Sequence, residues 1–221
     1  MTDTCPAVPL QAGCAICKKW LTPSNLSPKS GCYCRVCLPP SAIVRRRVTA
    51  EELWTTERPD TFENSDSLIR HFQTLEAGGT LQPIVVLPVA WTVDTMRQEV
   101  ESLRGRGPLH TAVMLRLEAA IVRLGHAAYC LLDGNHRALA AALRGTDLAA
   151  FVIATPAALD ELRQLQTDFP HPEGALEDLV WSWIEHAYGT MHHAPVAREP
   201  VTVAERARAL EENGLLPDLE A

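Results

Sequence analysis

The hydrophobic positions between residues 43 and 154 alternate between a spacing typical of strands and one typical of helices. Short apolar runs predict buried strands at residues 83–89, 126–132 and 148–153, and residues 44–48 are assigned as a first strand. Apolar residues three and four positions apart predict amphipathic helices at residues 65–77, 92–103 and 109–124. We therefore expect an α/β (α+β) core, with a compact mixed sheet and flanking helices.

Beyond residue 154 the spacing is helical. Thr155 before a proline is a typical helix start, and Thr202 with Glu205 forms a capping-box pattern before a final helix. We expect a helical C-terminal extension over residues 155–221. Its strongest apolar stripe comprises Leu176, Leu179, Val180, Trp183, Ile184 and Ala187. Two interpretations stand: the stripe covers the sheet, or it forms a surface for a homodimer or another partner.

The stretch Leu131-Leu132-Asp133-Gly134-Asn135-His136-Arg137 joins an apolar run to an alanine-rich helix through a glycine turn. Backbone N–H groups at a helix start and the positive end of the helix dipole favour an anion there. Arg137 adds a planar fork for phosphate oxygens, and His136 adds a group that donates, accepts or carries a proton. The sequence thus predicts a phosphate site at Gly134, Asn135, His136 and Arg137. The alternative is a loop with surface His and Arg next to an ordinary buried helix.

With the apolar run at residues 83–87 upstream, the stretch Asp133-Gly134-Asn135-His136-Arg137 resembles the ParB/sulfiredoxin-like superfamily over residues 45–154. The resemblance implies a compact α/β core with a phosphate-binding turn between a strand and a helix. It makes Gly134 the turn glycine, with His136 and Arg137 as the phosphate-contacting pair. Asn135 stands where sulfiredoxins carry their catalytic cysteine, so sulfinic acid repair is not implied. Chromosome-partitioning members show a Glu-Arg-Arg version of this box, so a partition role is not implied either.

What the resemblance implies is binding of a nucleotide or a DNA phosphate, with phosphoryl transfer or nuclease activity as outcomes. In a phosphotransferase, ATP or another nucleotide with Mg²⁺ would place its phosphates at the turn, and Arg137 would neutralise developing charge. His136 would bind phosphate or move a proton, while Asp133 would hold Mg²⁺, orient His136 or cap the helix. A nuclease would use His136 as general base. A DNA-binding protein would bind a backbone phosphate at these residues without catalysing a reaction.

Two Cys-x-x-Cys pairs lie near the N-terminus, separated by the sixteen residues 18–33, and their members are Cys14, Cys17, Cys34 and Cys37. This spacing is typical of a structural zinc ribbon or treble clef, in which four thiolates close a tetrahedral site. Cys32 is an alternative ligand in place of Cys34. Disulfides are a second alternative, but seven cysteines is an odd number and the sequence shows no secretory pattern. We therefore expect a reducing, cytoplasmic setting.

Charge is distributed unevenly along the chain, whose net charge is -7. From Thr4 to Ala50 there is no acidic residue, and the basic residues are Lys18, Lys19, Lys29, Arg35, Arg45, Arg46 and Arg47. Either this basic N-terminal module touches DNA, or the arginine run is the solvated start of the core. No apolar run approaches the ~20 residues of a membrane span. We expect four parts: a flexible tail (1–13), a zinc-binding module (14–38), the core (43–154) and the extension (155–221).

Overall fold

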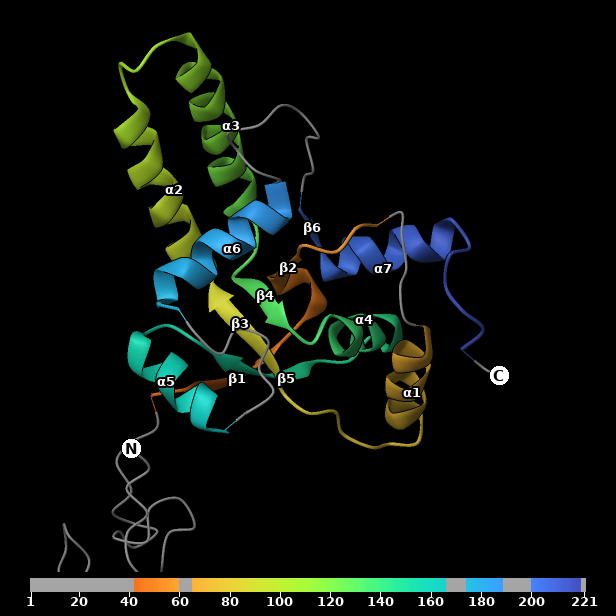
Figure 1. Cartoon of the computed structure of the whole chain (residues 1–221). Coiled ribbons are helices and arrows are strands. Elements are labelled where there is room, and N and C mark those ends of the chain that lie inside the picture. Colours follow the sequence, from red (N-terminus) through yellow and green to blue (C-terminus); the bar gives the residue numbers. More distant parts are fainter. Residues whose placement is uncertain (1–41, 60–64, 166–173, 189–199, 220–221) are drawn as a thin grey trace, which may run out of the picture. The chain divides into compact units, whose positions relative to one another are not determined.

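The computed structural model describes residues 42–59, 65–165, 174–188 and 200–219. These residues form a six-stranded mixed sheet in the order β1-β5-β3-β4-β2-β6 (Figure 1). The strands are β1 (Val44–Val48), β2 (Leu53–Thr55), β3 (Ile84–Pro88), β4 (Tyr129–Asp133), β5 (Leu148–Val152) and β6 (Val201–Thr202). Pairs β3–β5 and β2–β4 are parallel, whereas β1–β5, β3–β4 and β2–β6 are antiparallel. The mixed α/β class that the hydrophobic spacing predicts is confirmed.

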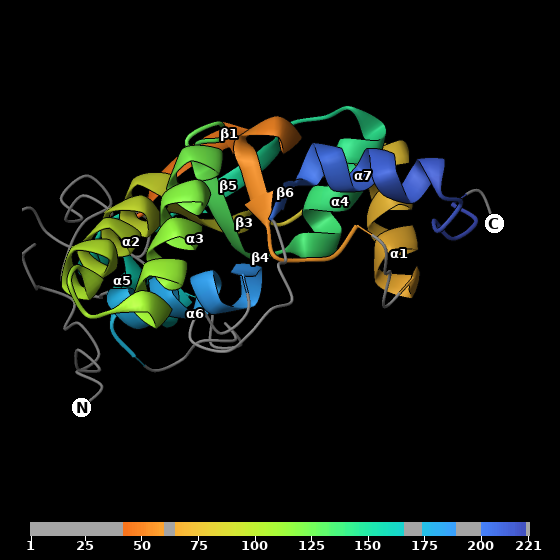
Figure 2. The same ribbon diagram turned by 90° about the horizontal axis from the view of Figure 1, so that it is seen from above.

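Helices pack on both faces of this sheet. They are α1 (Ser65–Glu76), α2 (Val89–Leu103), α3 (Pro108–Leu124), α4 (Asn135–Arg144), α5 (Pro156–Leu165), α6 (Leu176–Tyr188) and α7 (Val203–Glu212), with a short 3₁₀ helix η1 (Ala50–Glu52). Along β3, Val85 and Leu87 pack in one cluster with α2, α3, α5 and α6, whereas Ile84 and Val86 pack in a second with α4 and α7. Figure 2 shows these two groups of helices on opposite sides of the strands. Because both faces are covered, β3 is apolar throughout.

The structure differs from the sequence-based elements mainly at the short strands. Strands β2 and β6 contain three and two residues, too few for a periodicity to be recognised, and both escaped prediction. Strand β4 begins at Tyr129 rather than at 126, because the N–H of His126 still bonds back to the Arg123 carbonyl in the turn after α3. Helix α2 begins at Val89, directly after β3, and not at residue 92.

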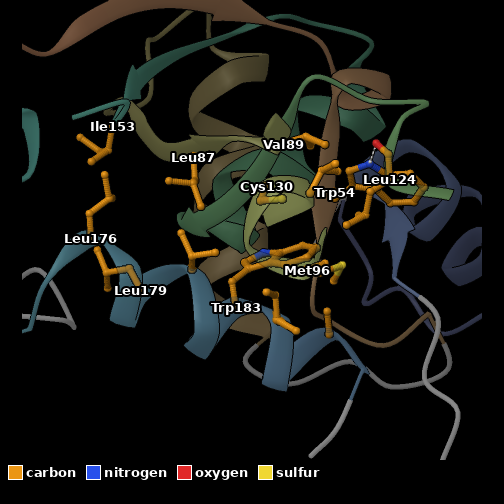
Figure 3. Packing of buried hydrophobic residues seen from close by; sticks show 14 of the residues in the cluster. Trp54, Leu87, Val89, Met96, Leu124, Cys130, Ile153, Leu176, Leu179 and Trp183 are labelled. Carbon is orange, nitrogen blue, oxygen red and sulfur yellow. Dashed lines mark hydrogen bonds between the residues drawn. The ribbon is translucent and has the colours of Figure 1, made fainter. Parts of the chain in front are cut away.

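The predicted C-terminal extension belongs to the same compact unit as the core, and this unit runs from Ala42 to Ala221. The buried residues of α6 are Leu176, Leu179, Val180, Trp183, Ile184 and Ala187, the whole of the predicted stripe. Figure 3 shows Trp183 and Leu179 directed towards the sheet residues Cys130 and Leu87. The stripe therefore covers the sheet, and β6 makes the extension not purely helical. A homodimer through the C-terminal helices stays a prediction, and its interface would have to use side chains outside this buried stripe.

The arginine run at residues 45–47 lies in β1, an outer strand of the sheet. The Arg45 guanidinium lies 5.2 Å from the centre of the Phe151 ring, and Nη2 of Arg47 donates to the Asp147 carbonyl at 2.9 Å. The run is therefore part of the first core strand, and two of its three side chains have partners near β5. DNA contact by this run stays a prediction.

The predicted tail (1–13) and zinc-binding module (14–38) lie outside the described residues. The contacts within the chain divide it into two units, Met1–Ser41 and Ala42–Ala221. Among the helices that the structure describes, none has the length and apolar character needed to cross a membrane.

Candidate functional site

The predicted glycine turn lies between β4 and α4. Strand β4 ends at Asp133, and Gly134 is the N-cap of α4, with φ 98° and ψ 30° in the left-handed region. A Cβ atom on this glycine would lie 2.7 Å from Cγ2 of Ile84 and 3.0 Å from two nitrogens of Arg137. Both the backbone conformation and the lack of space therefore require glycine here. The strand, turn and helix occur in the order that the sequence predicts.

The alanine-rich sequence of α4 lets this helix pack closely under the sheet. Its buried residues are Ala138, Leu139, Ala140 and Ala141. The N–H of Ala138 donates to the Gly134 carbonyl at 2.9 Å, which makes the first helical hydrogen bond. For the N–H groups of Asn135, His136 and Arg137 there is no carbonyl four residues earlier within the helix, as at every helix start. The start of α4 thus presents backbone donors beside a glycine whose Cβ position is filled by Ile84 and Arg137.

The Arg137 guanidinium holds the turn together. Its Nη2 lies 2.8 Å from Oδ2 of Asp133, and its Nη1 donates to the carbonyl of Pro83 at 2.8 Å. The Arg137 side chain is only 13% exposed. One predicted role of Asp133, capping of α4, is wrong. Gly134 occupies the N-cap position, and no side-chain capping hydrogen bond is made there. The roles of Arg137 in phosphate contact and of Asp133 in catalysis stay predictions.

Asn135 connects α4 to the end of β2. The buried hydroxyl of Thr55 donates to Oδ1 of Asn135 at 3.0 Å, and Nδ2 of Asn135 donates to Oε1 of Glu57 at 3.4 Å. The N–H of Glu57 donates in turn to the Thr55 hydroxyl at 3.1 Å. These bonds orient the Asn135 amide and place a carboxylate beside the helix start.

Arg206 of α7 lies on the far side of Glu57. Its Nη2 is 3.6 Å from Oε2 of Glu57, and its Nε donates to the Arg58 carbonyl at 3.0 Å. The arginine is 3% exposed, and this burial lowers the pKa of its guanidinium, an effect that the Glu57 carboxylate opposes. Glu57 is therefore oriented from two sides, by an amide and by a buried cation.

Helix α1 packs against α4 through Leu68, Phe72 and Leu75, and it carries two basic residues, Arg70 and His71. His71 of α1 is half-buried, and its pKa lies below the ordinary value of 6.5. The largest cause is desolvation by burial, followed by the positive charges of Arg137, His136 and Arg70. These four residues, His71, Arg70, His136 and Arg137, are called the basic cluster below. Positive charge beside a helix start favours an anion, and here the Asp133 carboxylate already offsets the charge of Arg137.

Sequence reasoning missed Thr55, Glu57, His71 and Arg206. Thr55 and Glu57 follow a strand too short to predict, and His71 carries no local signal within its helix. Arg206 did carry one, because Val203, Arg206, Ala207 and Leu210 form the buried face of α7 at helical spacing. A charged residue within an apolar stripe indicates a buried partner.

The described residues offer no clear metal centre. They contain no group of three or more His, Cys, Asp or Glu side chains that would hold a metal ion. Cys130 is fully buried, and this burial raises the pKa of its thiol to about 12, so it stays protonated at neutral pH. The predicted zinc ligands Cys14, Cys17, Cys34 and Cys37 lie outside the described residues.

A surface hollow of about 350 Å³ lies at the opposite end of α4. Its walls come from η1, the turn after α4, and α7, and include Thr49, Gly145 and Arg208. No residue of the glycine turn lines it. Residues 132–137, in contrast, are all half-buried. The start of α4 is thus a partly covered surface and not part of this hollow.

Comparison of the chain with models of protein families, with curated proteins and with solved structures found no match. Its function is therefore inferred from the residues and their geometry.

Proposed function

We propose that the start of α4 binds the phosphate group of a nucleotide. The observation that carries this proposal is the basic cluster, whose members His136 and Arg137 lie in the first turn of α4 beside Gly134, while His71 and Arg70 lie on α1, the helix that packs against α4. Backbone donors, a helix dipole and several basic side chains then act on one point. An anion at this point would be attracted by all of them.

A relationship to the ParB/sulfiredoxin-like superfamily is part of the same proposal. Two features support it: the residues Asp133-Gly134-Asn135-His136-Arg137, and their place between a strand and an alanine-rich helix beside the apolar strand β3. Asn135 in place of a cysteine argues against sulfinic acid repair. Its amide is held by Thr55 and Glu57, so the side chain has a defined orientation beside the turn.

Nucleotide-dependent phosphoryl transfer is the reaction that we assign to this site. Two carboxylates flank the turn: Asp133 directly precedes it, and Glu57 lies within 3.4 Å of the Asn135 amide. Mg²⁺ in such sites binds one or two carboxylates together with the phosphates, so Asp133 would be a ligand of a metal that arrives with the nucleotide. When bound, Mg²⁺ would neutralise phosphate charge. His136 would contact phosphate. Glu57, 45% exposed, would accept the proton of an acceptor hydroxyl as the oxygen of that hydroxyl bonds to the terminal phosphorus and the nucleoside diphosphate leaves.

The second candidate function is zinc-dependent DNA binding, with nuclease activity as its catalytic form. The supporting observation is the basic and acid-free sequence from Thr4 to Ala50, which contains the predicted zinc ligands. In this case Cys14, Cys17, Cys34 and Cys37 would organise a DNA-contacting module, and the glycine turn would hold a backbone phosphate.

Calorimetric titration of the zinc-loaded chain with ATP, ADP and CTP in Mg²⁺ tests the first candidate. We expect binding that is lost or weakened at least about tenfold in His136→Ala, because a direct phosphate contact disappears. His126→Ala is the matched control, since this exposed histidine lies beyond the opposite end of β4. Glu57→Gln should retain binding while transfer of the terminal phosphoryl group collapses. If the intact chain binds no nucleotide but binds DNA, the second candidate replaces the first.

A further inference from the structure

The hollow at the end of α4 is kept open by small side chains. It lies where η1, the turn after α4 and helix α7 meet, and its volume is about 350 Å³. Gly145 ends α4 in a left-handed conformation, and a Cβ atom added to it would have no atom within 4 Å. The alanines of the wall are Ala50, Ala141, Ala142, Ala204 and Ala207. Sites for small molecules measure roughly 300–1,000 Å³, so a hollow of this size fits a small ligand.

Charged side chains of both signs line the hollow. Glu51 of η1 and Glu211 of α7 provide exposed carboxylates, and Arg208 of α7 provides an exposed guanidinium. Among the residues that the structure describes, these three side chains form no ion pair and no hydrogen bond. Asp147 also lines the hollow, but its Oδ2 lies 3.8 Å from Nε of Arg47. Two carboxylates and one guanidinium are therefore available to a ligand.

This set of charges distinguishes three classes of ligand. An anion would be attracted by Arg208 but repelled by Glu51 and Glu211, and a cation would meet the reverse. A zwitterion, which carries an ammonium and a carboxylate, is attracted by both signs. The arginine fork holds a carboxylate through two parallel hydrogen bonds, and an ammonium donates to carboxylates. The C-terminal end of α4 adds the negative end of a helix dipole, which also favours an ammonium.

The alanines determine which further groups the ligand carries. Ala141 and Ala207 are buried, whereas Ala50, Ala142 and Ala204 are half-buried, so their methyl groups form an apolar part of the wall. Aliphatic groups gain free energy when they leave water for such a surface. A small aliphatic side chain therefore fits the hollow better than a nucleotide, whose phosphates the two carboxylates repel.

We propose that this hollow binds a free α-amino acid with a small aliphatic side chain. The carboxylate of the amino acid pairs with Arg208, its ammonium pairs with Glu51 and Glu211, and its side chain lies against the alanines. The hollow lies at the end of α4 opposite to the glycine turn, so the proposal does not rest on phosphate binding at that turn.

Valine and two analogues are the matched probes, because isobutylamine lacks the carboxylate of valine and isovalerate lacks its ammonium. Each is titrated into the isotope-labelled full-length chain at neutral pH, and the backbone amide signals are followed by NMR. We expect valine to bind at least about tenfold more tightly than either analogue, because each analogue loses a charge-assisted pair. The largest shifts should lie at Gly145, Thr146 and Arg208. Alanine and leucine are titrated in the same way, so that one side-chain size does not decide the test.

Two variants and a control assign the binding to this hollow. Arg208→Gln should lose at least about tenfold in valine affinity, while isobutylamine, which has no carboxylate, should bind no more weakly than before. Ala204→Leu places a larger side chain in the hollow and should abolish valine binding. Arg116→Gln, exposed on α3 and outside the hollow, should change neither affinity.

The outcomes separate the three classes of ligand. Isobutylamine binding as tight as that of valine would identify a cation site, and equally tight isovalerate binding would identify an anion site, so either result overturns the proposal. Shifts centred outside the hollow, an unchanged valine affinity in Arg208→Gln, or no binding of alanine, valine or leucine also overturn it. The comparison of probes in the unsubstituted chain needs no variant, so the test holds even if Ala204→Leu does not fold.

Discussion

Arg137 and Asp133 form an ion pair across the Gly134 turn, with 2.8 Å between Nη2 and Oδ2. The same guanidinium donates to the carbonyl of Pro83, the residue directly before β3. One side chain in the first turn of α4 thus ties together the end of β4 and the start of β3. The residue that the sequence most clearly marks for phosphate contact also builds the turn at which the phosphate would lie.

Replacing Arg137 should therefore destabilise the fold, independently of any ligand. Arg137→Ala removes charge-assisted bonds from a mostly buried position, and we expect the free energy of unfolding to fall by about 2 kcal/mol. Urea denaturation in phosphate-free buffer measures this loss. Arg116→Ala, on the exposed side of α3, is the control and should change little. Equal stability of the two variants would show that the Arg137 contacts contribute nothing to the turn.

Gly134→Ala tests the crowding at the turn. The new Cβ would meet Ile84 at 2.7 Å in a left-handed backbone conformation. Gly145 at the other end of α4 is also left-handed, but a Cβ added there would have no atom within 4 Å. We expect Gly134→Ala to lower the free energy of unfolding by about 1–3 kcal/mol more than Gly145→Ala, as an overpacked site does. A thermal or urea denaturation series that finds equal losses would contradict this crowding.

His71 should make stability depend on pH in a defined direction. Its pKa is lowered in the folded chain, so the unfolded chain binds more protons once the pH falls below about 6.5. Stability should therefore decrease as the pH falls through this window. Urea denaturation at pH 7.5 and 5.5, without phosphate, should show a smaller loss for His71→Gln than for the unsubstituted chain. An identical loss would mean that neither burial nor the neighbouring positive charges lower the pKa of His71 in the folded chain.

Zinc content tests the N-terminal prediction. We expect about one zinc ion per chain, because two Cys-x-x-Cys pairs supply one tetrahedral set of thiolates. Cys17→Ser and Cys34→Ser should lower the zinc content measured by mass spectrometry, whereas Cys5→Ser should not. Retention of zinc by Cys34→Ser with loss in Cys32→Ser would instead identify Cys32 as the ligand. A zinc-free chain would remove the proposed module.

The local parts of the site were predictable, because a glycine turn followed by a helix start is encoded in adjacent residues. Gly134 to Arg137 lie where the sequence places them, between a strand and a buried alanine-rich helix. The partners of these residues were not predictable. Thr55 reaches Asn135 only because β2 pairs with β4, and the charge of His136 affects the pKa of His71 only because α1 packs on α4. Such contacts depend on tertiary packing, which spacing along one chain does not reveal.

The same distinction applies to the C-terminal part. Its helices, the capping pair Thr202 and Glu205, and the apolar stripe of α6 were evident from periodicity and are confirmed. The pairing of β6 with β2, and the insertion of Arg206 towards Glu57, depend on where the chain returns after α6. A two-residue strand has no periodicity of its own, so only the structure reveals that this region completes both the sheet and the site.

The most direct test of phosphate binding at the start of α4 is a titration of the isotope-labelled chain with ATP and Mg²⁺, followed through the backbone amide NMR signals. We predict the largest shifts at Gly134, Asn135, His136 and Arg137, because these residues form the turn and the start of α4. Shifts centred instead on Gly145 and Arg208, at the hollow beyond the other end of α4, or no shifts at all, would contradict it.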